Sequence, residues 1–273
     1  MSTESKEIKE LVKERYGARA KRVIELSPIQ EVVADHEHGG GCGCDADTGC
    51  CGPIDLDHAV RLYKDSQLTG LPVESVAASA GCGNPTVLAG LREGERVLDL
   101  GSGGGIDCFL AAQQVGETGH VTGLDMTPDM LALARKNLAN VGLPNVEFVQ
   151  GEMESMPLPD EAYDVIISNC VVNLSPDKDA VFSESYRVLS PGGRIHLSDV
   201  LALTADGPAV TDAESWVGCT AGAEYKDVYL DRLHRAGFVD IEIGSEHFQF
   251  RGDEEERMPT NTASFKIVAR KPE

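Results

Sequence analysis

A short apolar run that ends in a cluster of glycines, V-L-D-L-G-S-G-G-G at residues 97–105, constrains this chain more than any other feature. Residues 96–100 suit a strand covered on both faces, and Ile106, Phe109 and Leu110 suit the apolar face of a helix that follows directly. Glycines let the backbone turn tightly and approach a ligand, while the N–H groups at a helix start favour a negative charge. The stretch predicts a strand, a ligand-binding turn and a helix.

The spacing of the glycines narrows the choice of ligand. A dinucleotide fingerprint requires G-x-G-x-x-G, and this loop has no glycine at the third place. Its pattern, D-x-G-x-G-x-G, resembles the first motif of the S-adenosylmethionine-dependent methyltransferases, whose cofactor offers the loop a carboxylate rather than a phosphate. Another nucleotide remains the alternative on this motif alone. The predicted cofactor-binding residues of the loop are Asp99, Gly101, Ser102, Gly103 and Gly105.

An acidic residue at the end of the next predicted strand supports this interpretation. Residues 120–124 lead into Asp125, which lies 24 residues after Gly101. An acidic side chain at this distance can accept hydrogen bonds from ribose hydroxyls and would repel a 2′-phosphate. The alternative role of Asp125 is a helix cap ahead of Pro128.

Further candidate cofactor residues follow the ends of other predicted strands. Met126 and Met153 would pack on a purine, with ordinary core packing as the alternative. Glu152 is expected at the same edge, and Asn169 would bond the amino-acid end of the cofactor or cap the following turn. Ligands of open α/β sheets lie beyond the carboxyl ends of the strands, so we expect these residues to converge there.

The alternation of apolar segments along the chain predicts the fold class. Predicted strands are residues 96–100, 120–124, 146–150, 164–168, 194–197, 239–243 and 264–269. Predicted helices are residues 6–26, 56–62, 72–80, 128–141, 178–189 and 225–236, besides the helix that begins at residue 106. This pattern is typical of a doubly wound, mostly parallel seven-stranded sheet of the Rossmann-like class.

The charge of the chain excludes some partners. Its 45 acidic and 24 basic residues give a net charge of −21, which repels nucleic-acid phosphates and anionic lipids. We expect neither a nucleic acid nor a membrane as a partner, and the acidic excess suits a high-salt cytoplasm. Residues 1–10 lack the apolar core of a signal peptide, and no apolar run reaches the length of a membrane span. A cytoplasmic location is therefore expected.

Eight cysteines in an intracellular chain of this length point to metal, metalloid or redox chemistry. Four of them lie in residues 36–52, a glycine-rich segment with too few apolar residues for a core, which predicts a loop that orders on a ligand. Structural zinc remains an alternative there, although the paired C-x-x-C spacing is absent. Cys108 is expected to be a small apolar residue on a helix.

Several segments together resemble one family. They are G-C-G before the first predicted strand, L-D-L-G-S-G-G-G-I-D-C, H-V-T-G-L-D-M-T, S-N-C-V-V-N-L-S-P-D-K, and S-D-V followed by W-x-x-C-x-x-G-A. This set is similar to the arsenite methyltransferases, which are class I enzymes that use S-adenosylmethionine. The likeness extends over about residues 16–238, and S-N-C-V-V-N-L-S-P-D-K is its most specific part.

By this resemblance, Cys82, Cys170 and Cys219 are the thiols that bind trivalent arsenic. Thiolates are soft ligands, and three of them can enclose a pyramidal ion whose lone pair attacks the sulfonium methyl. The family restores trivalent arsenic with an additional N-terminal thiol, which corresponds to Cys50 or Cys51, and a disulfide then needs an external reductant. The resemblance implies arsenite or a thiol–arsenic conjugate as substrate and a glutathione-like or thioredoxin-like dithiol reductant as co-substrate.

The predicted organisation has two parts. Residues 1–90 form a helical segment with the cysteine-rich loop 36–52, and residues 91–273 form the cofactor-binding domain with an arsenic-site insertion around 200–224. One alternative is a methyltransferase for a small organic acceptor, which the 5% aromatic content and the lack of a histidine at a strand end disfavour. Another is a metalloid-binding or sensing protein, for which an intact glycine loop with Asp125 is unnecessary.

Overall fold

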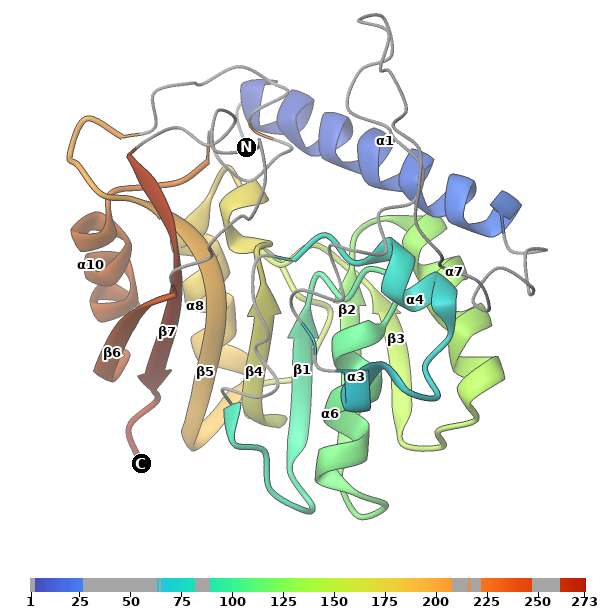
Figure 1. Ribbon diagram of the computed structural model, residues 1–273. Coiled ribbons are helices and arrows are strands. Elements are labelled where there is room, and N and C mark those ends of the chain that lie inside the picture. Colours follow the sequence, from blue (N-terminus) through green and yellow to red (C-terminus); the bar gives the residue numbers. More distant parts are fainter. Residues whose placement is uncertain are drawn as a thin grey trace, which may run out of the picture.

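The computed structural model describes residues 3–26, 63, 65–81, 89–207, 216, 222–246 and 261–273. Its strands are β1 (Arg96–Leu100), β2 (His120–Asp125), β3 (Val146–Gln150), β4 (Tyr163–Asn169), β5 (Leu189–Ala202), β6 (Val239–Glu246) and β7 (Thr262–Arg270). They form one sheet in the order β3-β2-β1-β4-β5-β7-β6 (Figure 1). The first five strands pair in parallel, and β7 runs antiparallel between β5 and β6. The predicted seven-stranded, mostly parallel sheet is confirmed.

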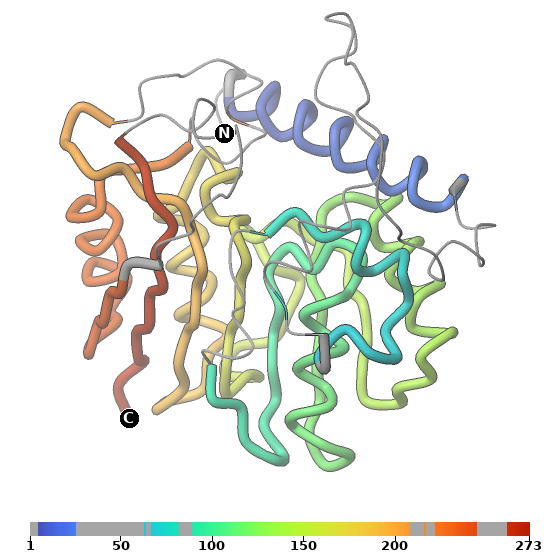
Figure 2. The backbone as a smooth tube through the Cα atoms, in the orientation of Figure 1, coloured from blue at the N-terminus to red at the C-terminus, as the bar shows by residue number. Residues whose placement is uncertain are grey.

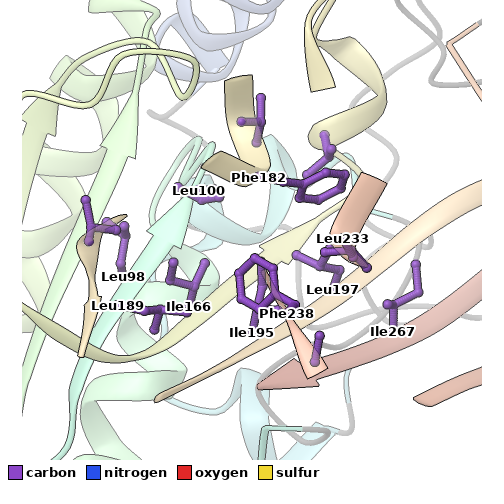
Figure 3. Close-up of a cluster of buried hydrophobic side chains, with 14 of the residues drawn as sticks. Leu98, Leu100, Ile166, Phe182, Leu189, Ile195, Leu197, Leu233, Phe238 and Ile267 are labelled. Atoms are coloured by element: carbon purple, nitrogen blue, oxygen red, sulfur yellow. The ribbon is translucent and has the colours of Figure 1, made fainter. Parts of the chain in front are cut away.

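Helices cover both faces of the sheet. Helices α4 (Val73–Ala78), α6 (Ile106–Val115) and α7 (Pro128–Val141) contribute to one apolar cluster, and α8 (Lys178–Val188) and α10 (Lys226–Ala236) to another. Successive strand residues point to opposite faces, so that Val97 joins the first cluster and Leu98 the second. Figure 3 shows the second cluster, which contains Phe182 and Leu233 from the two helices and Leu98 from β1. This is the doubly wound arrangement that the sequence predicts.

Local signals set the boundaries of α7. Pro128 is its first residue, where a missing N–H costs no helical hydrogen bond. Gly142 ends it with a φ of 72°, a left-handed conformation in which a β-carbon is unfavourable. The predicted range of residues 128–141 is the observed one.

The fifth strand is longer than its sequence indicates. The sequence predicts a strand over residues 194–197, because Pro191, Gly192 and Gly193 signal the end of the preceding helix. The observed β5 extends over Leu189–Ala202. On β4, Tyr163 pairs with Leu189 whereas Val165 pairs with Arg194, so the proline and glycines occupy a bulge. Beyond it, β5 pairs continuously with β7 from Arg194 to Ala202.

The N-terminal helix α1 (Thr3–Leu26) agrees with the predicted amphipathic helix and packs on α4 and α7 (Figures 1 and 2). Arg19 Nη2 donates hydrogen bonds to the carbonyl oxygens of Ala77 and Ser79, at 3.2 and 2.6 Å. The helix predicted over residues 72–80 corresponds to α4, which is slightly shorter. The short helix α3 (Asp65–Leu68) precedes it. The helix expected over 56–62 and the loop 36–52 lie outside the described residues.

Candidate functional site

A pocket lies beside the carboxyl ends of β1, β2, β3 and β4, where the turns that follow these strands meet α1. It holds about 880 Å³ of empty space, part of it open to solvent. Segments far apart in the sequence therefore share one wall, as expected for an open α/β sheet. The predicted site residues that line it are Gly101, Ser102, Gly103, Asp125, Met126, Met153, Asn169 and Cys170.

The glycine loop forms one side of this pocket. Gly101 has a φ of 68°, and a β-carbon there would lie 2.4 Å from a methyl carbon of Val171. Gly103, with a φ of 51°, would direct a β-carbon into space with no atom within 4 Å. No side chain therefore separates the backbone from an approaching ligand. A side chain at Gly101 or Gly103 would be strained by the left-handed backbone conformation. Gly105 lies behind the pocket wall, packed against Phe109 and Phe148.

Asp125 is held by the backbone of two neighbouring segments. Its Oδ2 accepts a hydrogen bond from the Gly103 N–H at 2.9 Å, and its Oδ1 accepts one from the Thr127 N–H at 2.8 Å. Burial raises the pKa of this carboxyl, and the N–H donors partly oppose that rise. Asp125 lines the pocket, and a carboxylate there is an acceptor for hydrogen bonds from a ligand.

A buried polar cluster lies beside the glycine loop. Asp107 Oδ2 accepts a hydrogen bond from Asn169 Nδ2 at 3.2 Å, and Tyr63 Oη donates to both Asp107 oxygens at 3.0 and 3.1 Å. Burial raises the pKa of Asp107 to about 6, although both donors lower it. Burial, with the charge of Asp107, raises the pKa of Tyr63 well above its usual value, so the phenol stays a donor.

Besides Gly105, two other predicted cofactor residues do not line the pocket. Asp99 is buried beneath the loop, where its Oδ2 accepts a hydrogen bond from the Cys108 thiol at 3.2 Å. Burial raises the pKa of Asp99 well above its usual value, as it does that of Cys108. Glu152 directs its carboxylate to Lys9 of α1, at 2.7 Å. Cys108 is fully buried, in agreement with its expected role as a small core residue.

Cys170 occupies the pocket edge at the end of β4. Its φ of 60° is unusual for a residue with a side chain, and its N–H donates to the Ser198 carbonyl oxygen at 2.7 Å. The thiol is buried among apolar groups that include Val12 of α1 and Leu174 of η1 (Val172–Leu174). Such a conformation is retained where surrounding contacts over-determine it, and it occurs often at functional sites.

The other predicted arsenic and redox thiols, Cys82, Cys219, Cys50 and Cys51, lie outside the described residues, as does the cluster considered for zinc. Residues that flank two of them are described. A β-carbon on Gly81 would lie 2.2 Å from Asn169 Nδ2, so these residues are in direct contact.

Trp216 and Gly222 flank Cys219 in the sequence. Trp216 Nε1 donates a hydrogen bond to the Leu174 carbonyl oxygen at 3.3 Å. A β-carbon on Gly222 would lie 2.0 Å from the Asn173 carbonyl oxygen. Among the residues that the structure describes, no group of three or more metal-ligating side chains gathers at one point. The described part of the chain also contains no helix with the length and apolarity to cross a membrane.

Known proteins show the family to which this chain belongs. A family model for a methyltransferase domain matches residues 91–237. The arsenite methyltransferase of Halobacterium salinarum is 42% identical over 273 residues, which cover 97% of this chain and 67% of that protein. This chain belongs to the arsenite methyltransferase family. The human arsenite methyltransferase is 41% identical over 168 residues, which are 58% of this chain and 44% of the human protein.

A solved structure agrees with this family membership. The arsenic(III) S-adenosylmethionine methyltransferase of Chlamydomonas reinhardtii superposes with a TM-score of 0.62 at 38% identity, covering 79% of this chain and 73% of that one. The resemblance and the class of methyltransferase predicted from sequence are thus confirmed. The chain spans about two thirds of the length of the Halobacterium relative and less than half of the human one.

Several residues that line the pocket were not predicted from the sequence. Val12, Tyr16, Gly81, Asp107 and Glu154 all line the pocket. Asp107 had a signal, because it is an acidic residue on the otherwise apolar face of a helix that begins at the glycine loop. The others are brought to the pocket by contacts between distant segments.

Proposed function

We propose that this chain transfers the methyl group of S-adenosylmethionine to trivalent arsenic bound by the thiols of Cys82, Cys170 and Cys219. The observation that carries the proposal is the thiol-bearing end of β4. Cys170 lines the pocket directly after Asn169, the last residue of β4. The residues that flank the other two cysteines contact this same turn.

The contact between Gly81 and Asn169 supports a shared role of Cys82 and Cys170. Each cysteine directly follows one member of this contact in sequence. Consecutive Cα atoms are about 3.8 Å apart, so both thiols begin one residue beyond the contact. Two thiolates that meet beside this contact could bind one soft ion.

The flanks of Cys219 support its inclusion. Trp216 and Gly222 contact Leu174 and Asn173, which belong to the turn after Cys170. Cys219 lies three residues from each flank, a chain length that spans at most roughly 11 Å. This short span between two anchored residues supports the inclusion of Cys219 in the proposed ligand set.

The pocket residues suit S-adenosylmethionine. Ser102 Oγ is buried in the wall and has no hydrogen-bond partner among the described residues, so it can donate to a ligand. Asp125 can accept from ribose hydroxyls, and Asp107 with Asn169 suits a charged amino-acid end. The carboxylate of the ligand would favour the N-terminus of α6. When bound, the donor supplies an electrophilic methyl group on its sulfonium.

Methyl transfer to arsenic requires a redox partner. The arsenic lone pair forms the bond to the methyl carbon while the bond from carbon to the sulfonium sulfur breaks, which oxidises the arsenic from the trivalent to the pentavalent state. Two thiolates return two electrons to the arsenic and become a disulfide, and a glutathione-like or thioredoxin-like dithiol reduces that disulfide. Cys50 or Cys51 is the proposed exchanging thiol, and arsenite or a thiol–arsenic conjugate the substrate.

Single substitutions of the three thiols test the ligand set. Cys170→Ser, Cys82→Ser and Cys219→Ser should each abolish methylation of arsenite and lower the number of sulfur neighbours seen by arsenic X-ray absorption from three to two. Cys108→Ser, which replaces a buried thiol that does not line the pocket and keeps a donor to Asp99, is the matched control and should leave the three sulfur neighbours in place. Full turnover in any of the serine variants would refute the role of that cysteine.

A further inference from the structure

One buried ammonium group joins three segments of the pocket region. Lys9 of α1 is 4% exposed, and its Nζ lies 2.7 Å from Glu152 Oε2 and 3.0 Å from Glu154 Oε2. Glu154 Oε1 accepts a hydrogen bond from Ser175 Oγ at 2.6 Å. Helix α1, the turn after β3 and the segment after η1 are thus connected through Lys9 and Glu154.

The connected segments form the wall of the cofactor pocket. Val12 and Tyr16 lie one and two turns beyond Lys9 on the same side of α1 and line the pocket, and Met153 and Glu154 line it from the turn. Lys9 itself does not line the pocket. Its contacts instead set the distance between the helix above the pocket and the turn beside it.

The buried Lys9 side chain forms ion pairs with both Glu152 and Glu154. Burial lowers the pKa of Lys9, but hydrogen bonds and charges from Glu152 and Glu154 outweigh it, so the pKa is raised overall. The hydrogen bond from Lys9 is the main cause of the lowered pKa of Glu152. Removal of the lysine would take the ammonium away from Glu154 and leave Glu152 with Lys13, whose Nζ lies 3.4 Å from Glu152 Oε1, so the connection between the turn and α1 would weaken.

We propose that Lys9 is a positioning residue for S-adenosylmethionine, which holds α1 and the turn of residues 151–156 at the separation that the bound cofactor requires. The inference rests on the proposed function of the pocket. It assigns a role in cofactor binding to a residue more than 140 positions away in sequence from the turn that it holds.

The test is Lys9→Met, which keeps the length of the side chain and removes its charge. The dissociation constant for S-adenosylmethionine, measured by titration calorimetry, should rise about tenfold, equivalent to ~1.4 kcal/mol. The turnover number at saturating S-adenosylmethionine should stay within about twofold of wild type, because loss of positioning for binding alone raises KM. A purely structural role would lower the melting temperature and leave the dissociation constant unchanged, which would overturn the proposal.

Two further variants complete the design. Lys21→Met removes an exposed lysine of the same helix, 3.1 Å from Asp129, and should leave cofactor affinity unchanged. Glu154→Gln keeps the side-chain volume and should also weaken cofactor binding, so it carries the test if Lys9→Met does not fold. Unchanged affinity in a folded Glu154→Gln would contradict the inference. Wild-type protein that binds no S-adenosylmethionine would refute the proposed function instead.

Discussion

Substitution of Gly81 by alanine probes the contact between the two thiol-bearing segments. A β-carbon at this position would lie 2.2 to 2.4 Å from three atoms of the Asn169 amide, inside van der Waals contact. The φ of Gly81 is not in the left-handed region, so the backbone itself tolerates alanine. The effect is therefore the displacement of Asn169.

The expected size of the effect follows from the hydrogen bond between Asn169 and Asp107. Asn169 Nδ2 donates to Asp107 Oδ2 at 3.2 Å, and loss of a hydrogen bond to a charged group costs about 1.5–3 kcal/mol. If the Gly81 segment moves instead, overpacking costs about 1–3 kcal/mol. Either response weakens binding of S-adenosylmethionine by roughly 10- to 100-fold. It also shifts Cys82 relative to Cys170, so turnover at saturating cofactor should fall as well.

The assay combines calorimetric titration with S-adenosylmethionine and steady-state methylation of arsenite. Gly244→Ala is the matched control, since a β-carbon there would have nothing within 4 Å and should change neither quantity. If Gly81→Ala binds S-adenosylmethionine and turns over as the wild type does, the argument that this contact orders the site is wrong.

Two further predictions concern stability. His196 is buried, its ring nitrogens have no hydrogen-bond partner among the described residues, and burial is the main cause that lowers its pKa from 6.5 to about 4. The folded state therefore binds fewer protons than the unfolded state between these values, so stability falls as the pH drops through this window, by roughly 3 kcal/mol. His196→Phe should flatten this part of the profile in denaturant titrations at several pH values, and an equal acid loss in both proteins would contradict the assignment. The net charge of −21 predicts that the melting temperature rises from low to molar potassium chloride, and a flat salt series would refute that expectation.

The sequence predicted the parts of the fold that depend on local signals. Helix α7 begins at Pro128 and ends before Gly142, because both residues restrict the backbone at their own positions. The limits of β5 were wrong at both ends, because Leu189 pairs with β4 ahead of the bulge that holds Pro191, and pairing with β7 continues to Ala202. Strand extension by a neighbouring strand is a tertiary effect that no window of sequence contains.

The candidate site divides in the same way. The positions of Gly101 and Asp125 at strand ends follow from the order of strands, so both could be expected at the pocket. The direction of the Glu152 side chain could not, because Lys9 on a distant helix determines it. Tyr63 donates a hydrogen bond to Asp107 although the two residues are 44 positions apart, and no sequence motif predicts this contact.

Identification of the arsenic product tests methyl transfer to thiol-bound arsenic most directly. Reduced protein would be incubated with S-adenosylmethionine carrying a labelled methyl group, arsenite and a dithiol, and the arsenic species separated by chromatography. Wild-type protein should yield labelled methylarsenic, and Cys170→Ser should yield none. Absence of methylated arsenic from wild-type protein that demonstrably binds S-adenosylmethionine would contradict the proposed methyl transfer.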